Sequence, residues 1–166
     1  MLKNILVLLL SSVIFVLLWF AGLEKIYANV LVFFANVILA ILSTSTSLNL
    51  MVQEGELVII VTTVLKGVQG TFPQKLQSLL LPTVILLSWL PVLFLHLTRR
   101  SAILQSLKNA GVFFLLQILF MLILSSYYHS AVSRYLFYLF IEAFYIMAII
   151  IIIKDALKYP YIWKQS

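Results

Sequence analysis

The sequence contains no cysteine, and its 166 residues include only two histidines and five acidic residues. The absence of cysteine excludes disulfide bonds, thiolate metal ligands and cysteine nucleophiles. The few histidines and carboxylates form no cluster along the chain, so we expect neither a metal site nor a cofactor. A P-loop, a dinucleotide-binding fingerprint and a Gly-x-Ser-x-Gly nucleophile elbow are also absent. These absences favour a protein without enzymatic activity.

Charge is also scarce, since only 10% of the residues are charged while 64% are hydrophobic. A soluble domain is about one quarter charged and about half apolar. We therefore predict an integral membrane protein whose surroundings are the lipid bilayer. The net charge of +6 would suggest nucleic-acid binding in a soluble protein. In a chain this apolar, the excess of Lys and Arg in cytoplasmic loops explains that charge better, and we expect no nucleic-acid partner.

Long hydrophobic runs dominate what is present. A helix needs about 20 apolar residues to cross the hydrocarbon core. Five segments approach this length, at residues 5–23, 26–42, 79–97, 107–126 and 135–153. We predict an all-α integral membrane fold, a bundle of about five transmembrane helices in a single domain over residues 1–166. Only Glu24-Lys25 separates the first two segments, so we expect a tight helical hairpin; a cleaved signal peptide is the alternative for the first segment. Pro82 and Pro91 predict a kinked third helix.

Residues 43–78, between the second and third segments, predict a different structure. Within residues 48–64, two β-prone runs flank Glu54-Gly55-Glu56, which is typical of a β-hairpin; an irregular loop is the alternative. The second run is too short to span as a helix, and an open strand edge cannot lie in lipid. We therefore expect the hairpin at the extracytoplasmic membrane surface or against the bundle. The residues from Lys66 to Pro73 predict a loop.

The distribution of basic residues predicts the orientation. With five helices, one side of the membrane would carry seven of the eleven basic residues, namely Lys25, Arg99, Arg100, Lys108, Lys154, Lys158 and Lys164. Positive charge is enriched in cytoplasmic loops. We therefore predict a multi-pass protein of the cell (inner) membrane with a cytoplasmic C-terminus and an external N-terminus. Arg99 and Arg100 form a cytoplasmic basic loop that would meet lipid headgroups, although Lys3 argues against this orientation.

Four polar residues lie at membrane depth and are candidates for a functional layer. Glu142 is the ionisable residue placed well inside a predicted span, about 10 Å from its start at 1.5 Å per residue. Asn36, Gln117 and Ser88 are predicted in the same half of the bilayer, so the four side chains would form one polar layer. Glu142 would act as a proton or cation relay or as a ligand contact. The alternative is a carboxyl group that joins helices by hydrogen bonds.

The predicted outer face offers two further candidates. His129 follows two tyrosines in the loop between the last two spans, and Arg134 lies close to it in the sequence. A histidine and an arginine together could serve catalysis or anion binding. An ordinary interfacial loop is the alternative.

The layout of residues 27–153 resembles the exosortase/archaeosortase family of membrane transpeptidases. The resemblance consists of a helix, a β-like segment ending in Leu57-Val58-Ile59-Ile60-Val61, a Gly-containing outer loop, a long helix, the basic loop at Arg99-Arg100 and two further helices. It implies sortase-like chemistry with an outer Cys, an Arg and a His. The family's Cys would fall near residues 68–70, where there is none, its Arg motif near residues 120–124 has no polar residue, and His129 is the remaining candidate. The resemblance therefore implies a catalytically degenerate relative.

Three functions stay open at the level of sequence. The first is a non-enzymatic accessory or scaffolding subunit of a larger membrane complex, with other membrane subunits as partners. The second is a degenerate exosortase-like protein that binds a sorting signal or a lipid-linked substrate at its outer face. The third is a small oligomeric carrier that uses Glu142.

Glu142 separates the structural and carrier hypotheses by mutation. If it joins helices, Glu142→Gln keeps the hydrogen-bonding capacity and leaves thermal stability nearly unchanged, while Glu142→Leu costs about 0.6–2 kcal/mol. We expect this result in a thermal-unfolding assay run beside a flux assay. A folded Glu142→Gln protein without flux would instead assign Glu142 to a relay, because an amide does not exchange the proton.

Overall fold

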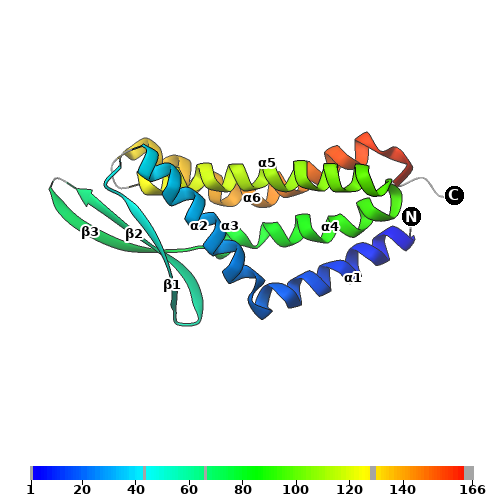
Figure 1. The fold of residues 1–166 in the computed structure, drawn as a ribbon, viewed down its shortest axis with the longest axis horizontal. Helices are drawn as coiled ribbons and strands as arrows, with labels where there is room; N and C mark the ends of the chain where they lie inside the picture. Colours follow the sequence, from blue (N-terminus) through cyan, green and yellow to red (C-terminus); the bar gives the residue numbers. More distant parts are fainter. Residues whose placement is uncertain (1, 43, 66, 128–129, 163–166) are drawn as a thin grey trace.

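The computed structural model describes residues 2–42, 44–65, 67–127 and 130–162. The molecule is an elongated helical bundle with a three-stranded sheet at one end (Figure 1). The helices are α1 (Leu2–Leu18), α2 (Glu24–Ile41), α3 (Gln77–Leu80), α4 (Pro82–His96), α5 (Arg99–Ser125) and α6 (Ala131–Lys158). A π-helical turn, η1 (Trp19–Leu23), joins α1 to α2, and a short 3-10 turn, η2 (Pro160–Ile162), follows α6. The strands are β1 (Ser47–Gln53), β2 (Glu56–Leu65) and β3 (Val68–Lys75).

The first two predicted segments form one bent helix instead of a tight hairpin. The chain is helical on both sides of Gly22, and the bend occurs at Gly22, where the backbone is non-helical with a φ of 124° that is open to glycine and strained for other residues. Glu24 and Lys25 are good helix formers, so they continue the helix and do not break it. As a result, α1 packs on α4 and α2 packs on α5, and the two halves open away from each other (Figure 1).

This bend changes the number of candidate spans. Among the described residues, three helices are long and apolar enough to cross a membrane, at Asn4–Ile41, Gln77–His96 and Arg99–Ser125. The two arms of α6, bent by 50° between residues 141 and 143, together make a fourth. The chain is therefore a multi-pass membrane protein with three to four candidate spans, fewer than the five expected. The difference comes from the N-terminal pair, which counts as one bent helix.

The two prolines of the third predicted span differ in their position within α4 and in their effect on it. Pro82 is the first residue of α4, one residue after the end of α3, where a missing backbone N–H costs little. Pro91 lies inside α4, where it removes one backbone hydrogen bond. The third span is thus divided at its N-terminal end, between α3 and α4.

Both ends of the described chain lie at the same end of the bundle (Figure 1). The side-chain amide of Asn4 in α1 donates a hydrogen bond to the carbonyl of Ile162, and its oxygen lies 2.9 Å from Nε2 of His96. The sequence predicted termini on opposite sides of the bilayer. In the structure the two terminal segments are bonded to each other. One bent helix followed by three further passes along the bundle brings the chain back to the end where it began.

The predicted β-hairpin is confirmed, and a third strand extends it. Ser47 to Gln53 pair with Glu56 to Thr62 in antiparallel register, around a two-residue turn in which Glu54 and Gly55 have φ values of 52° and 82°. Two positive φ angles match the right-handed twist of a hairpin. The loop expected for residues 66–73 is wrong from Val68 onward, because β3 pairs with β2 up to Lys75; Gly67 is a turn, and Lys66 lies outside the described residues. Pro73 is tolerated there because β3 is an edge strand.

Asn36 of α2 joins the bundle to the sheet. Its Nδ2 donates to the carbonyl of Leu48 at 2.7 Å, and its Oδ1 accepts from the Leu48 N–H at 2.9 Å. Both bonds go to the outer edge of β1, so the amide takes the place of a neighbouring strand. Leu48, Ile59 and Val61 are buried on the same core as α2, which fixes the sheet against the helices.

We expect Asn36→Leu to lower the free energy of unfolding by about 1–3 kcal/mol, because it leaves the N–H and the carbonyl of Leu48 without partners. Thermal unfolding together with amide exchange at Leu48 measures this effect. Asn29→Leu is the matched control on the same helix, since Asn29 is exposed and, among the described residues, bonds to the carbonyl of Lys25 within α2. Equal stability losses in the two variants would show that the Asn36 bonds do not hold the strand.

Candidate functional site

The predicted polar layer is distributed over separate sites. Asn36 binds the edge of β1, as described above. Gln117 is fully buried in α5, where it accepts a hydrogen bond from the Tyr27 hydroxyl and donates to the carbonyl of Leu79 at 2.7 Å. Ser88 donates to the carbonyl of Val84 within its own helix, and its own carbonyl accepts from Ser11 of α1 at 2.8 Å. The structure does not bring these three side chains together.

The other predicted residues lie at the ends of the bundle or outside the described part. Glu142 belongs to α6, but its side chain lies outside the described part of the structure, and His129 lies outside the described residues altogether. Arg134 is exposed, with its guanidinium carbon 5.5 Å from the ring centroid of Tyr127. Arg99 and Arg100 are exposed at the start of α5.

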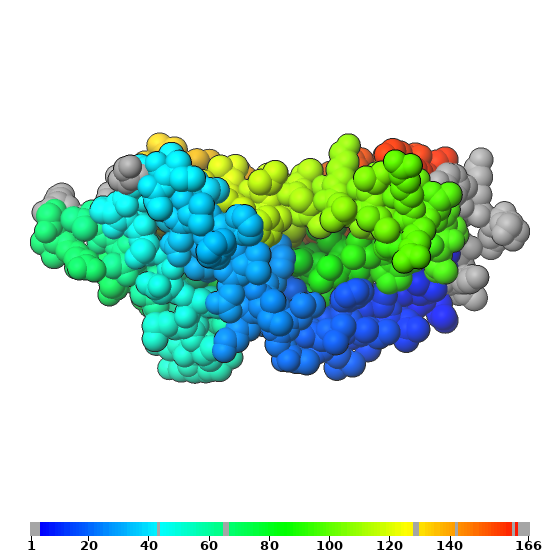
Figure 2. Space-filling model, in the orientation of Figure 1, coloured from blue at the N-terminus to red at the C-terminus, as the bar shows by residue number. Residues whose placement is uncertain are grey.

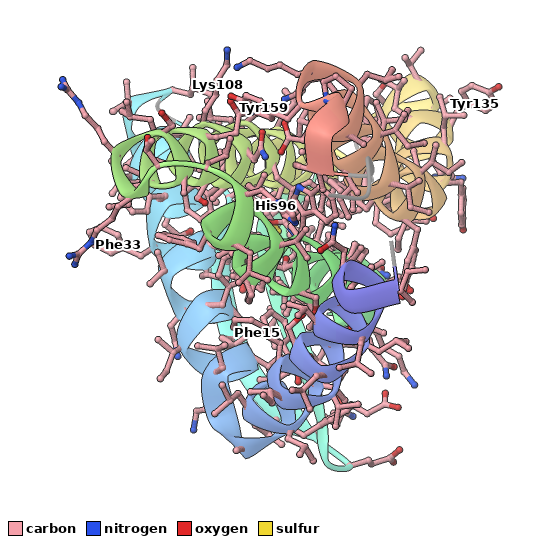
Figure 3. The ribbon with its side chains drawn as sticks, turned by 90° about the vertical axis from the view of Figure 1, so that its right-hand side faces the viewer. Phe15, Phe33, His96, Lys108, Tyr135 and Tyr159 are labelled. Atoms are coloured by element: carbon pink, nitrogen blue, oxygen red, sulfur yellow. The ribbon has the colours of Figure 1, made fainter. Side chains whose placement is uncertain are left out.

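An apolar cleft of about 490 Å³ lies between the bent N-terminal helix and the pair α4–α5. It exists because α1 and α2 diverge from the bend at Gly22 and rest on different helices. Figure 3 shows Phe15 of α1 in the space between α1, α2 and α4. The lining residues are Phe15, Trp19, Leu23, Tyr27, Val30, Thr83, Leu86, Leu87, Trp89, Leu90, Leu107, Asn109, Ala110, Gly111, Phe113 and Phe114.

The cleft opens between α2 and α5. Among its lining residues, Val30 of α2 and Leu107 of α5 are 43% and 66% exposed, while Trp19, Trp89 and Phe113 are buried deep in it. Ala110 and Gly111 are also exposed, and because their side chains are small, the cleft is open on the α5 side. Figure 2 faces this side of the molecule, where atoms of α4 are visible between α1 and α5.

The Trp19 indole N–H is buried at the cleft without a hydrogen-bond partner among the described residues, while the other polar side chains along the cleft are engaged. The Tyr27 hydroxyl donates to Gln117, and the Thr83 hydroxyl accepts from Gln117 at 3.2 Å. The side chains of Trp89 and Asn109 both donate to Asp155. The cleft therefore offers aromatic and aliphatic surface, which suits a hydrocarbon ligand.

Asp155 is the centre of the densest polar cluster among the described residues. Its carboxylate is completely buried where α6 meets α4 and α5. Oδ2 accepts from Trp89 Nε1 at 3.2 Å and from Asn109 Nδ2, and Oδ1 accepts from Gln105 Nε2 at 2.8 Å. The ammonium of Lys154 lies 3.7 Å from Oδ1. A carboxylate has only acceptors, and three neutral donors together with a nearby cation satisfy it.

Two lysines complete this cluster at its rim. Lys154 donates to Asn109 Oδ1 at 3.1 Å, and Lys158 donates to Gln105 Oε1 at 3.0 Å. Each amide of α5 thus donates to Asp155 and accepts from a lysine. Because Gln105 and Asn109 are four residues apart, both face α6 from one side of α5.

This cluster was missed at the level of sequence. The spans predicted at residues 107–126 and 135–153 place Asn109 near the start of the fourth span and Asp155 just past the end of the last one. The i, i+4 spacing of Gln105 and Asn109 was the available signal, since it places two amides on one helical face. The helix α5 begins at Arg99, earlier than expected, so both amides lie inside the bundle.

Comparison of the chain with models of protein families, with curated proteins and with solved structures found no match in any of the three. No family membership is shown, and the resemblance to the exosortase/archaeosortase family stays a prediction.

Proposed function

We propose that this chain is a non-enzymatic multi-pass membrane protein that binds the hydrocarbon chain of a lipid or lipid-linked molecule in the cleft between the bent N-terminal helix and α4–α5. The observation that carries the proposal is the cleft itself. Its volume of about 490 Å³ is in the range of small-ligand pockets, and its walls are aromatic and aliphatic. The lipid-linked substrate considered from the sequence would then bind from the side of the bundle.

The length of the cleft favours a single chain over a partner helix. The lining residues extend from Leu107 to Phe114 on α5 and from Thr83 to Leu90 on α4. Seven residue steps of 1.5 Å correspond to about 10 Å along each helix. A partner that crosses the bilayer as a helix would need a groove of about 30 Å. The accessory-subunit hypothesis therefore requires another surface of the bundle, and the cleft supports the lipid-binding one.

We further infer that both termini face the cytoplasm and that the sheet lies on the outer side. The bundle end that carries the terminal segments also carries most of the basic residues, namely Lys3, Arg99, Arg100, Lys108, Lys154 and Lys158. With four helical passes instead of five, these residues would share one side of the membrane. Lys3, which argued against the orientation predicted from five helices, then agrees with the other basic residues. This arrangement follows the excess of Lys and Arg on the cytoplasmic side, and it directs Arg99 and Arg100 towards anionic headgroups.

Labelling of single cysteines tests this orientation, since the native chain has none. We expect an impermeant thiol reagent to label Gln69→Cys on β3 in intact cells and to leave Lys3→Cys and Ser101→Cys unlabelled until the cells are opened. Gln69 and Ser101 are both exposed, so access differs only through the membrane. Labelling of Lys3→Cys in intact cells would contradict the common location of the termini.

Filling the cleft from Gly111 tests the binding proposal. A side chain at this position meets no atom within 4 Å of its Cβ, so Gly111→Phe adds a ring to the cleft without a backbone clash. In bilayer nanodiscs that contain phospholipid with a dibrominated acyl chain, we expect strong quenching of Trp19 and Trp89 in the native protein. Gly111→Phe should reduce this quenching several-fold, because the bromine atoms no longer approach the two rings.

The matched control is Val112→Phe, which adds a ring to the neighbouring position of α5, 46% exposed and outside the cleft. It should leave the quenching of both tryptophans unchanged. Native mass spectrometry of the gently extracted protein provides a second measurement, in which we expect a retained lipid. If quenching is equal in the native protein and in Gly111→Phe, the cleft does not bind the acyl chain. If mass spectrometry then shows a retained protein subunit and no lipid, the accessory-subunit hypothesis is favoured instead.

A further inference from the structure

The buried carboxylate of Asp155 is linked to two walls of the cleft. Its Oδ2 accepts from the indole of Trp89 on α4 and from the amide of Asn109 on α5, and both side chains line the cleft. Asp155 itself is not among the lining residues. One oxygen atom on α6 thus sets the positions of two cleft side chains that belong to two other helices.

The 3-10 turn η2, which follows α6, is bonded to α1, the helix that forms the third side of this part of the cleft. The carbonyl of Ile162 in η2 accepts from the amide of Asn4, which lies near the start of α1. The Ile162 side chain is fully buried in a small cluster with Trp89 and two further residues of α4, and Val7 and Leu8 of α1 pack against that cluster. The segment from Asp155 to Ile162 therefore contacts α1, α4 and α5, the helices that form the half of the cleft nearer the chain termini.

The chemistry of this junction exceeds what packing alone requires. A buried charge is costly in a membrane protein, and an apolar residue at position 155 would join helices at lower cost. A carboxylate accepts on both oxygens and donates on neither. It therefore forces the donor ends of Trp89, Asn109 and Gln105 to converge on one point, which an apolar side chain cannot do.

We propose that Asp155 is a positioning residue for the cleft, and that the docked segment 155–162 and a hydrocarbon chain in the cleft stabilise each other. The proposal rests on the binding function proposed above. Coupling between two sites is reciprocal, so a chain in the cleft holds the segment in place as strongly as the segment favours binding. Release of the segment would loosen the start of α1, which is bonded to Ile162 through Asn4, and widen the cleft.

The test uses Asp155→Asn and two measurements. The first is the quenching of Trp89 by a dibrominated fatty acid titrated into the solubilised protein, in a Trp19→Phe, Trp163→Phe background. Loss of the interhelical bonds, worth about 0.6–1.7 kcal/mol in membranes, should raise the apparent dissociation constant about three- to twentyfold. The emission maximum of Trp89 should shift as well, because its N–H loses the carboxylate.

The second measurement is independent of any ligand. Spin labels at Leu6→Cys on α1 and Leu157→Cys on α6, both well exposed, report how the two terminal segments lie relative to each other. We expect one narrow distance distribution in the native protein and a broader one in Asp155→Asn. Addition of the brominated fatty acid should narrow it again. Asn4→Leu, which removes the bond to Ile162, should broaden it in the same way.

Asn36→Leu is the control for general destabilisation, because Asn36 binds the sheet at the opposite end of the bundle. It should leave the emission of Trp89 and the label distance unchanged. If Asp155→Asn does not fold, Asp155→Glu keeps the charge but moves the carboxylate by one methylene, and it should still shift the Trp89 emission.

The two proposals fail separately. A native protein without quenching would refute chain binding, and the label distances would then decide on Asp155 alone. Unchanged distances and unchanged Trp89 emission in Asp155→Asn and Asp155→Glu would overturn the positioning role, even if Gly111→Phe abolished quenching. Broader distances without any change in the dissociation constant would overturn the coupling.

Discussion

The bend at Gly22 determines most of what is distinctive in this molecule. Because the backbone is non-helical at Gly22 and the helix resumes directly after it, the N-terminal helix changes direction there, passes from α4 to α5 and does not fold back on itself. A straight helix would lie along one neighbour and leave no space beside it. The bent one touches α4 with its first half and α5 with its second, and the cleft is the gap that remains between them. The common position of the two termini has the same origin.

Within this frame, polar groups at membrane depth are paired in small separate sets. Gln117 joins Tyr27, Thr83 and the carbonyl of Leu79, and so connects α2, α4 and α5 with the short helix α3. Asp155 joins three helices at the opposite end of the cleft. In a bilayer no water replaces a lost partner, so each set holds its helices in one relative position. The cleft lies between two such sets and keeps its shape because both of its ends are held.

Hydropathy and turn chemistry were enough to predict the membrane setting, the helical segments and the first hairpin. Glu54-Gly55 is a local signal, and the alternation of residues around it is local as well. The third strand was not predictable in the same way, because Pro73 argues against a strand unless its N–H would face outward on an edge strand. That information lies in the pairing of β3 with β2, which a single sequence does not state.

The candidate site shows the same division between local and tertiary information. Gln117 and Ser88, which the sequence places at membrane depth, are buried in the structure. Their partners were not predictable, because a helical period gives the direction of a side chain but not the helix that it meets. The tight hairpin expected at Glu24-Lys25 was wrong for a related reason. Two charged residues suggest a loop in lipid, whereas here their helix propensity continues the helix from Glu24, and the interruption is confined to the positive φ of Gly22.

The bond pair between Asn36 and Leu48 also limits how the sheet can associate. An open sheet has two edges, and either one can recruit a strand from another molecule. Here α2 packs along β1, and the side-chain amide of Asn36 bonds to both the N–H and the carbonyl of Leu48. This edge therefore cannot pair with a strand from another molecule. Only β3 is left, and Pro73 within it lacks a donor. Association through the sheet would therefore join two molecules edge to edge and stop there, since neither member of the pair retains a second open edge from which a fibril could grow.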